Sequence, residues 1–224
     1  MSFMHNDEIP CPKCGKTFEI ERWDSINSEI SPELIDKVVD GSFFRFKCPH
    51  CEEETIHLYP LLINVMTPEG GFIKLTGDPE GEAKETAGMF SDLDPQMAAL
   101  MKKAAPKRYR FVNYLPDLVE KVELFRAGID DRTIEIVKLF LFKALKAKGV
   151  DADQIRWFKD EEGKAYWAAG NKEKQFFIPF EQEAFKGMED LFRDQDPHWE
   201  EDNRSTYIVN EDWALNWMDK TLKK

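Results

Sequence analysis

Two pairs of cysteines constrain the fold of this chain more than any other feature of its sequence. Cys11 and Cys14 form one pair, Cys48 and Cys51 form the other, and the chain has four cysteines in all. Two thiolates separated by two residues can bind one tetrahedral ion from a tight turn, and two such turns supply four ligands. The spacing therefore predicts one structural metal site per chain, and zinc is the expected ion.

The segment between the two pairs has the residue signals of one helix and one strand. Gly15 gives the backbone freedom that is needed where the chain leaves the first turn. Ser31 can cap a helix that has Pro32 at its first position, and Gly41 can end that helix. A short strand over residues 42–46 then leads to the second pair. The insert is longer than that of a compact zinc ribbon, but its content fits a single metal site.

Two redox interpretations use the same four cysteines. Cys48-Pro49-His50-Cys51 resembles the motif of thioredoxin-like oxidants. In those proteins a helix starts at the first cysteine and lowers its thiol pKa, whereas residues 52–60 here read as a turn and a strand. A rubredoxin-like site would hold iron, and ligand type alone does not separate iron from zinc. A redox or electron-transfer protein is therefore the alternative to a structural zinc protein.

The charge of the chain disfavours nucleic acid as a partner. The formal net charge is −12 and the sequence pI is about 4.9, whereas nucleic-acid binders usually present a basic surface to the phosphates. Only residues 106–150 are net basic. Within them Lys138, Lys143 and Lys146 recur at helical spacing, which predicts a solvated helix face.

The sequence shows no signal for a membrane or for secretion. The longest apolar run, around residues 61–66, is far shorter than the roughly 18 residues that a membrane helix needs. The first ten residues have neither a basic region nor an apolar core, so they do not read as a signal peptide. We therefore expect the protein in the cytoplasm, where cysteines persist as thiols or metal ligands.

The middle of the chain reads as strands followed by helices. Residues 54–66 and 72–76 have the pattern of two strands, and the Pro/Gly-containing turn at 67–71 predicts that they form a hairpin. The other elements expected before residue 113 are a loop over 77–92 with a weak helix at 83–89, a short helix from Pro95 capped by Asp94, and a strand at 109–112.

Two longer helices follow, over residues 116–127 and 131–148, and each is ended by a glycine. Asp130 and Asp131 invite a catalytic interpretation. A helix N-terminus favours both a capping residue and negative charge, so we interpret this pair as structural.

The helix over 131–148 has apolar residues on far more than the stripe of about 100° that is typical of a surface helix. We therefore expect a second surface to cover it, and the C-terminal region that follows directly is the nearest candidate. Glu135, Lys138 and Lys146 mark the side that we expect to face water. The apolar residues are Ile134, Ile136, Val137, Leu139, Phe140, Leu141, Ala144 and Leu145.

Residues 151–224 contain five of the six tryptophans. Trp213 and Trp217 lie four residues apart, on one face of the expected last helix, and we interpret such rings as core rather than as a ligand cage. The elements expected here are strands at 154–158, 165–169 and 175–178, a helix at 181–193, a short strand at 207–209 and a helix capped by Asn210.

The two CPxC pairs and the stretch Trp23-Asp24-Ser25-Ile26-Asn27 resemble the bacterial and archaeal CpXC domain family, and so does the segment 118–135. The resemblance covers about residues 9–140. It implies that the four cysteines are metal ligands, but the family has no established activity, so it implies a site and not a function. Glu52 stands where the family usually has a glycine after the second pair.

These observations predict an α+β protein. Residues 1–149 are expected to form a zinc-ribbon-like β domain with appended helices, and residues 150–224 a small Trp-rich α+β domain. We find no Gly-rich phosphate loop, nucleophile elbow or HExxH motif. The leading hypothesis is a non-enzymatic interaction or adaptor protein with one structural Zn²⁺ at Cys11, Cys14, Cys48 and Cys51. Its expected partner is another protein, and a monomer is favoured over an oligomer.

Overall fold

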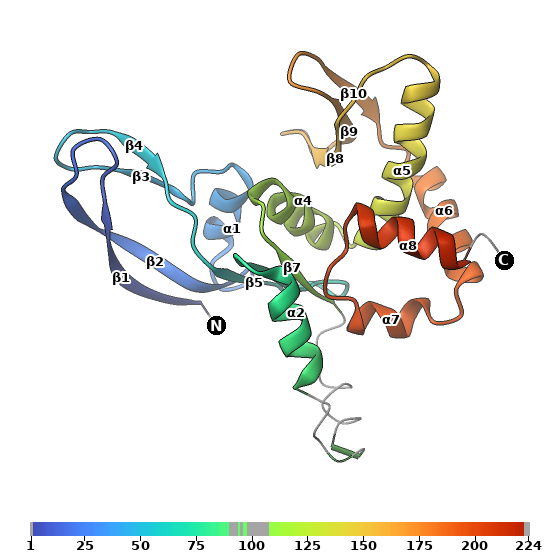
Figure 1. Cartoon of the computed structure of the whole chain (residues 1–224), viewed down its shortest axis with the longest axis horizontal. Coiled ribbons are helices and arrows are strands. Elements are labelled where there is room, and N and C mark those ends of the chain that lie inside the picture. Colours follow the sequence, from blue (N-terminus) through green and yellow to red (C-terminus); the bar gives the residue numbers. More distant parts are fainter. Residues whose placement is uncertain (1, 90–93, 95, 98–107, 222–224) are drawn as a thin grey trace.

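The computed structural model describes residues 2–89, 94, 96–97 and 108–221. Within this part of the chain, strands form three sheets of five, three and two strands, and helices pack against them (Figure 1). The α+β class is therefore confirmed, with the cysteines near the N-terminus. The helix expected from Pro95 lies outside the described residues, apart from 94, 96 and 97.

The main sheet contains β1 (Phe3–Pro10), β2 (Thr17–Asn27), β5 (Leu61–Val65), β6 (Gly71–Leu75) and β7 (Tyr109–Val112). Its order is β1-β2-β5-β6-β7. β1 pairs antiparallel with β2, and β5 pairs antiparallel with β6 through the predicted turn. The other two pairings are parallel. Only Ser25 to Asn27 of β2 pair with β5, so most of the β1–β2 hairpin extends beyond the rest of the sheet.

A second hairpin lies beside this extension. It consists of β3 (Arg45–Lys47) and β4 (Glu54–Ile56), which pair only with each other. We call residues 3–24 and 45–56 the hairpin arm. The arm points away from the body of the molecule, and the turns of both hairpins lie at its tip (Figure 1, blue and cyan).

The strands expected at 42–46 and 54–66 were partly wrong. Phe43 and Phe44 precede β3 and are buried in the main core, where both rings contact Tyr59. The chain therefore leaves the second hairpin after β4 and enters the main sheet only at β5. Pro60, which has no N–H to donate to a ladder, lies between the two strands.

Helices cover the main sheet and fill the space toward the C-terminal region. α1 (Pro32–Val39) and α4 (Leu115–Arg126) pack on each other and on the strands. α2 (Pro79–Gly88) is longer than the weak helix expected at 83–89, because Asp78 caps its N-terminus through Gly81. α5 (Asp131–Ala147) has the predicted cap, in which Asp130 accepts a hydrogen bond from the Arg132 backbone.

The C-terminal region has the three predicted strands and one helix that was not predicted. Its strands are β8 (Gln154–Lys159), β9 (Ala165–Gly170) and β10 (Gln175–Pro179), and its helices are α6 (Gln182–Gln195), α7 (Trp199–Ser205) and α8 (Glu211–Thr221). The strand expected at 207–209 was wrong. Residues 207–209 make one backbone–backbone hydrogen bond to the main sheet among the described residues, from Phe111 N–H to the Tyr207 carbonyl at 2.9 Å.

The first half of α5 is buried on all sides, as its apolar residues predict. It contacts α4 of the N-terminal half and β8, α6 and α8 of the C-terminal region. One set of buried apolar side chains therefore runs from the main sheet to Trp157, Trp199 and Trp217. The prediction that Glu135 and Lys138 face water was wrong, since they are only 9% and 7% exposed.

No helix in the described residues combines the length and the apolar composition that a bilayer span requires.

Candidate metal centre

The turns of the two hairpins bring all four cysteines together at the tip of the arm. Cys11 and Cys14 lie in the β1–β2 turn, and Cys48 and Cys51 lie in the β3–β4 turn. The Cys11 and Cys51 sulfurs are 3.6 Å apart, and the Cys14 and Cys48 sulfurs are 3.8 Å apart. All four sulfurs lie within 4.8 Å of one another, so the sequence prediction of one four-cysteine group is matched by the geometry.

The two turns have the same backbone hydrogen bonds. In each, the N–H of the first cysteine donates to the carbonyl five residues later, and its own carbonyl accepts from the N–H four residues later. The bonds are Cys11 N to Lys16 O (2.9 Å), Gly15 N to Cys11 O (2.9 Å), Cys48 N to Glu53 O (2.8 Å) and Glu52 N to Cys48 O (2.9 Å). Each turn thus points two sulfurs to the same side.

Backbone amides also hydrogen bond the sulfurs. The amide of Cys14, with a smaller effect from that of Lys13, lowers the pKa of the Cys11 thiol to about 7. At Cys51 the Glu53 amide lowers the pKa, but burial and the neighbouring thiols outweigh it and raise the pKa to about 12. The thiols of Cys11 and Cys51 therefore do not ionise independently. A bound dication removes the repulsion that opposes their joint ionisation.

The centre is half enclosed by a small core of its own. Cys11 and Cys48 are buried with Ile9, Phe18 and Ile20, and this group is separate from the main core. Cys14 is exposed. Lys13 and Glu53 form an ion pair of 2.7 Å across the two turns, but both side chains are exposed, so it contributes little.

These residues fit a metal ion in both donor type and spacing. A tetrahedron of sulfurs around zinc with bonds of about 2.3 Å has edges of about 3.8 Å, and the two measured edges are 3.6 and 3.8 Å. A disulfide would require about 2.0 Å. Thiolates suit both zinc and iron. The helix that a thioredoxin-like motif needs is not present at Cys48, because this cysteine is preceded by β3 and followed by a turn and β4.

The histidines do not belong to this group. His50 lies in the second turn but is exposed, His5 is 3.3 Å from Asp24 and His198 is 3.6 Å from Glu201. His57 lies beside the Tyr59 ring. Four thiolates complete a tetrahedral site without them.

The family model described as CpXC protein matches residues 9–138, which is more than half of the chain and includes both cysteine pairs. The chain belongs to the CpXC family. The resemblance over residues 9–140 is thereby confirmed, while α6, α7, α8 and the β8–β10 sheet lie outside the match. No curated protein and no solved structure matches the chain.

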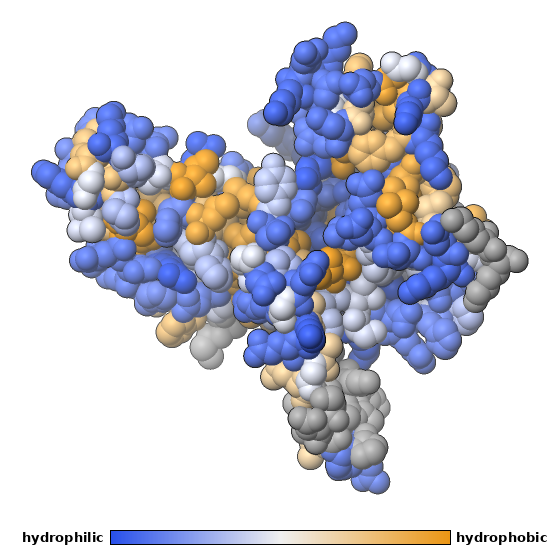
Figure 2. Space-filling view, viewed as in Figure 1, coloured by the Kyte–Doolittle hydropathy of each residue, from blue (hydrophilic) through white to orange (hydrophobic). Residues whose placement is uncertain are grey.

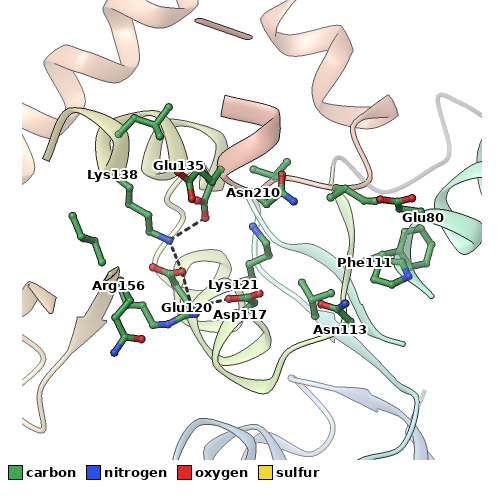
Figure 3. Close-up of a pocket in the computed structure, with 18 of the residues that line it drawn as sticks. Glu80, Phe111, Asn113, Asp117, Glu120, Lys121, Glu135, Lys138, Arg156 and Asn210 are labelled. Carbon is green, nitrogen blue, oxygen red and sulfur yellow. Dashed lines mark hydrogen bonds and ion pairs between the residues drawn. The ribbon is translucent and has the colours of Figure 1, made fainter. Parts of the chain in front are cut away.

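Sequence reasoning missed a second group of charged side chains, which includes Glu120 and Lys121 of α4 and Glu135 and Lys138 of α5 (Figure 3). Lys138 donates to Glu120 at 2.7 Å and to Glu135 at 3.0 Å. In the same group, Asp131 accepts from Arg110 of β7 at 2.8 and 3.0 Å and from Lys121 at 3.0 Å. All of these side chains are buried. Apart from Glu135 and Lys138, which are three residues apart on α5, the partners come from different elements, so spacing along one helix gives no signal for them.

Proposed function

We propose that this CpXC protein is a cytoplasmic, non-enzymatic interaction protein whose hairpin arm is held in shape by one Zn²⁺. The observation that carries the proposal is the set of four sulfurs at tetrahedral spacing, contributed equally by two hairpins that share no strand pairing. Cys11, Cys14, Cys48 and Cys51 would be the ligands, and the ion would supply a cross-link between the hairpins.

A structural role for the metal is favoured by its ligand set. Four thiolates fill the coordination of zinc, so no position is open for a water or a substrate. The arm also needs such a cross-link, because β3 and β4 have three residues each and the core of the arm is small. Hairpins of this size are marginal alone in water.

An interaction role is favoured by the shape and surface of the arm. It extends from the body, and its tip is mainly hydrophilic, with apolar surface toward the main sheet (Figure 2). Phe3, Met4 and Ile56 of the arm are 57%, 40% and 57% exposed. Large apolar side chains that stay exposed on a projecting arm favour contact with another protein. The reducing cytoplasm would keep the cysteines available for the metal.

Site-specific photo-crosslinking in cells tests this proposal. A photo-reactive amino acid replaces Ile56 on the arm or, as a control of matched exposure, Leu191 on α6, which is 53% exposed. We expect a discrete cross-linked product from position 56 only, and its loss in a Cys48→Ser background. Equal products from both positions, or none from position 56, contradict an interaction through the arm. A red protein with stoichiometric iron favours the electron-transfer alternative.

A further inference from the structure

A cavity of about 540 Å³ lies where the CpXC region meets the C-terminal region. α4, α5, β7 and β8 line it, together with residues 77–80 and 208–211 (Figure 3). Its volume is within the range of about 300–1,000 Å³ that is usual for small-molecule sites. It is far from the cysteines, since none of the hairpin arm contributes to its lining.

One wall of the cavity is a buried carboxylate–ammonium cluster. Lys138 Nζ bridges Glu120 and Glu135, and the other oxygen of Glu120 accepts a 2.7 Å hydrogen bond from the Trp157 backbone. Glu120 therefore has its oxygens engaged and is fixed in place. Burying such charges costs free energy that an apolar core would not, and clusters of this kind are frequent at functional sites.

Glu135 is the member of the cluster that can still accept a hydrogen bond. Its Oε1 accepts from Lys138 at 3.0 Å, while no described residue donates a hydrogen bond to its Oε2. Burial raises the pKa of Glu135, with Lys138 opposing the shift and Glu120 adding to it. A cationic donor in the cavity would bind the free oxygen and stabilise the ionised carboxylate.

The remaining charges favour a cation in this cavity. Seven carboxylates and three cationic side chains line it, which gives a formal charge of −4. The three cations already have carboxylate partners: Lys121 is paired with Asp131, Lys138 with Glu120, and Arg156 with Asp117 at 2.8 Å. A cavity with a net negative charge concentrates cations.

The shape and ligand atoms favour an organic cation over a metal ion. In the described residues, the four cysteines are the only group of three or more potential ligand atoms that converge closely enough for a metal. The cavity wall also includes apolar side chains such as Phe111, Leu139 and Val209. We propose that this cavity binds a small aliphatic amine, with its ammonium group at Glu135 and its hydrocarbon chain against that apolar wall.

Three probes of equal chain length test the proposal by calorimetric titration at neutral pH: hexylamine, hexanoate and 1-hexanol. The full-length protein is titrated with each. We expect saturable binding of hexylamine, at least about tenfold tighter than binding of hexanoate or hexanol, since one charge-assisted contact accounts for about that factor. Binding of hexanoate or hexanol that is as tight as that of hexylamine, or no saturation by hexylamine, overturns the proposal.

Two variants and one control locate the binding. Glu135→Gln keeps an acceptor for Lys138 but removes the charge, and it should weaken hexylamine binding about tenfold. Glu183→Gln, at an exposed position of α6 that does not line the cavity, should leave it unchanged. Asp153→Asn combined with Glu211→Gln alters two exposed lining residues with little risk to folding and should weaken binding severalfold. Hexylamine affinity of Glu135→Gln or of the Asp153/Glu211 double variant that equals that of the unaltered protein contradicts the assignment.

Discussion

Glu52 occupies in the second metal-binding turn the position that Gly15 occupies in the first, and both residues have left-handed backbones, with φ of 60° and 72°. Glu52 is the only residue other than glycine with a positive φ in the described part of the chain. The departure from the usual family glycine therefore leaves the fold of the turn unchanged. It places a side chain in a conformation that costs about 1–2 kcal/mol.

Glu52→Gly should therefore stabilise the metal-loaded arm by about 1 kcal/mol, because glycine adopts this conformation without the steric cost. The contact that is lost, Lys47 to Glu52 at 3.9 Å, is exposed and weak. Chemical denaturation followed by circular dichroism measures the change. Gly15→Ala is the matched control, since its added methyl group meets no atom within 4 Å, and it should destabilise by a similar amount. A destabilised Glu52→Gly variant contradicts this explanation.

Cys48→Ser should unfold the hairpin arm and leave the rest of the protein folded. Zinc in small metal-dependent folds contributes about 10–16 kcal/mol, and the core of the arm is separate from the main core. The near-ultraviolet circular dichroism of the buried tryptophans should persist, while amide exchange accelerates in β1 to β4. His50→Ala, in the same turn, should change neither. Loss of the tryptophan signal in Cys48→Ser would mean that the two cores unfold as one unit.

Asp131→Ala should destabilise the protein by about 3–5 kcal/mol, because it leaves the buried charges of Arg110 and Lys121 without their carboxylate. Asp36→Ala removes the partner of Arg126 in an exposed ion pair and should cost less than about 1 kcal/mol. Denaturant unfolding compares the two variants. Equal losses of stability in the two variants contradict a larger stabilising role for the buried ion pairs of Asp131.

The ion pairs of Asp131 with Arg110 and Lys121 also predict a pH dependence of stability. Burial alone raises the pKa of Asp131, but Arg110 and Lys121 outweigh it and hold this pKa well below its usual range. A carboxyl with a depressed folded-state pKa stabilises the fold above its unfolded pKa of about 4 and loses that contribution as the pH falls. The stability difference between the unaltered protein and Asp131→Asn should therefore shrink below about pH 4. A stability difference that stays constant from pH 6 to pH 3 contradicts a depressed pKa of Asp131.

A chain that ends at Gly149 should aggregate, because removing the C-terminal region uncovers one side of α5. Trp199 is one of the residues that would be lost. Its ring packs on Arg132, with the guanidinium 4.0 Å from the ring centre, and the Trp199 carbonyl accepts a hydrogen bond from Arg132 at 2.5 Å. Burying each large apolar side chain contributes about 1.5–3 kcal/mol. Light scattering should show aggregates for the short chain and a monomer for the full chain. A soluble, monomeric short chain contradicts this view of α5.

Local signals in the sequence predicted the elements that local chemistry determines. The paired cysteines predicted the four-sulfur group. Asp130 and Gly149 predicted the two ends of α5 to within a residue or two. Each of these features depends on residues that are neighbours in the chain or on a ligand set that allows one arrangement.

Features that depend on distant partners were missed. Lys138 and Glu135 have helical spacing and charge, which on a single helix indicates a face toward water. They are buried because Glu120 on another helix reaches Lys138 across the interface. Likewise, Arg110 of β7 donates hydrogen bonds to the C-terminal region, to the carbonyl of Thr206 and to the side chain of Asn203. Sequence spacing carries no information about such pairs.

Metal content tests the central claim most directly. The protein is produced in cells without added metal, purified in the absence of chelators, and analysed for zinc and iron by mass spectrometry. The four converging sulfurs predict one zinc per chain, a colourless solution, and release of the ion only when the four thiols are modified. Stoichiometric iron with visible absorbance, or a metal-free folded protein with a Cys11–Cys14 disulfide, would contradict a structural zinc centre.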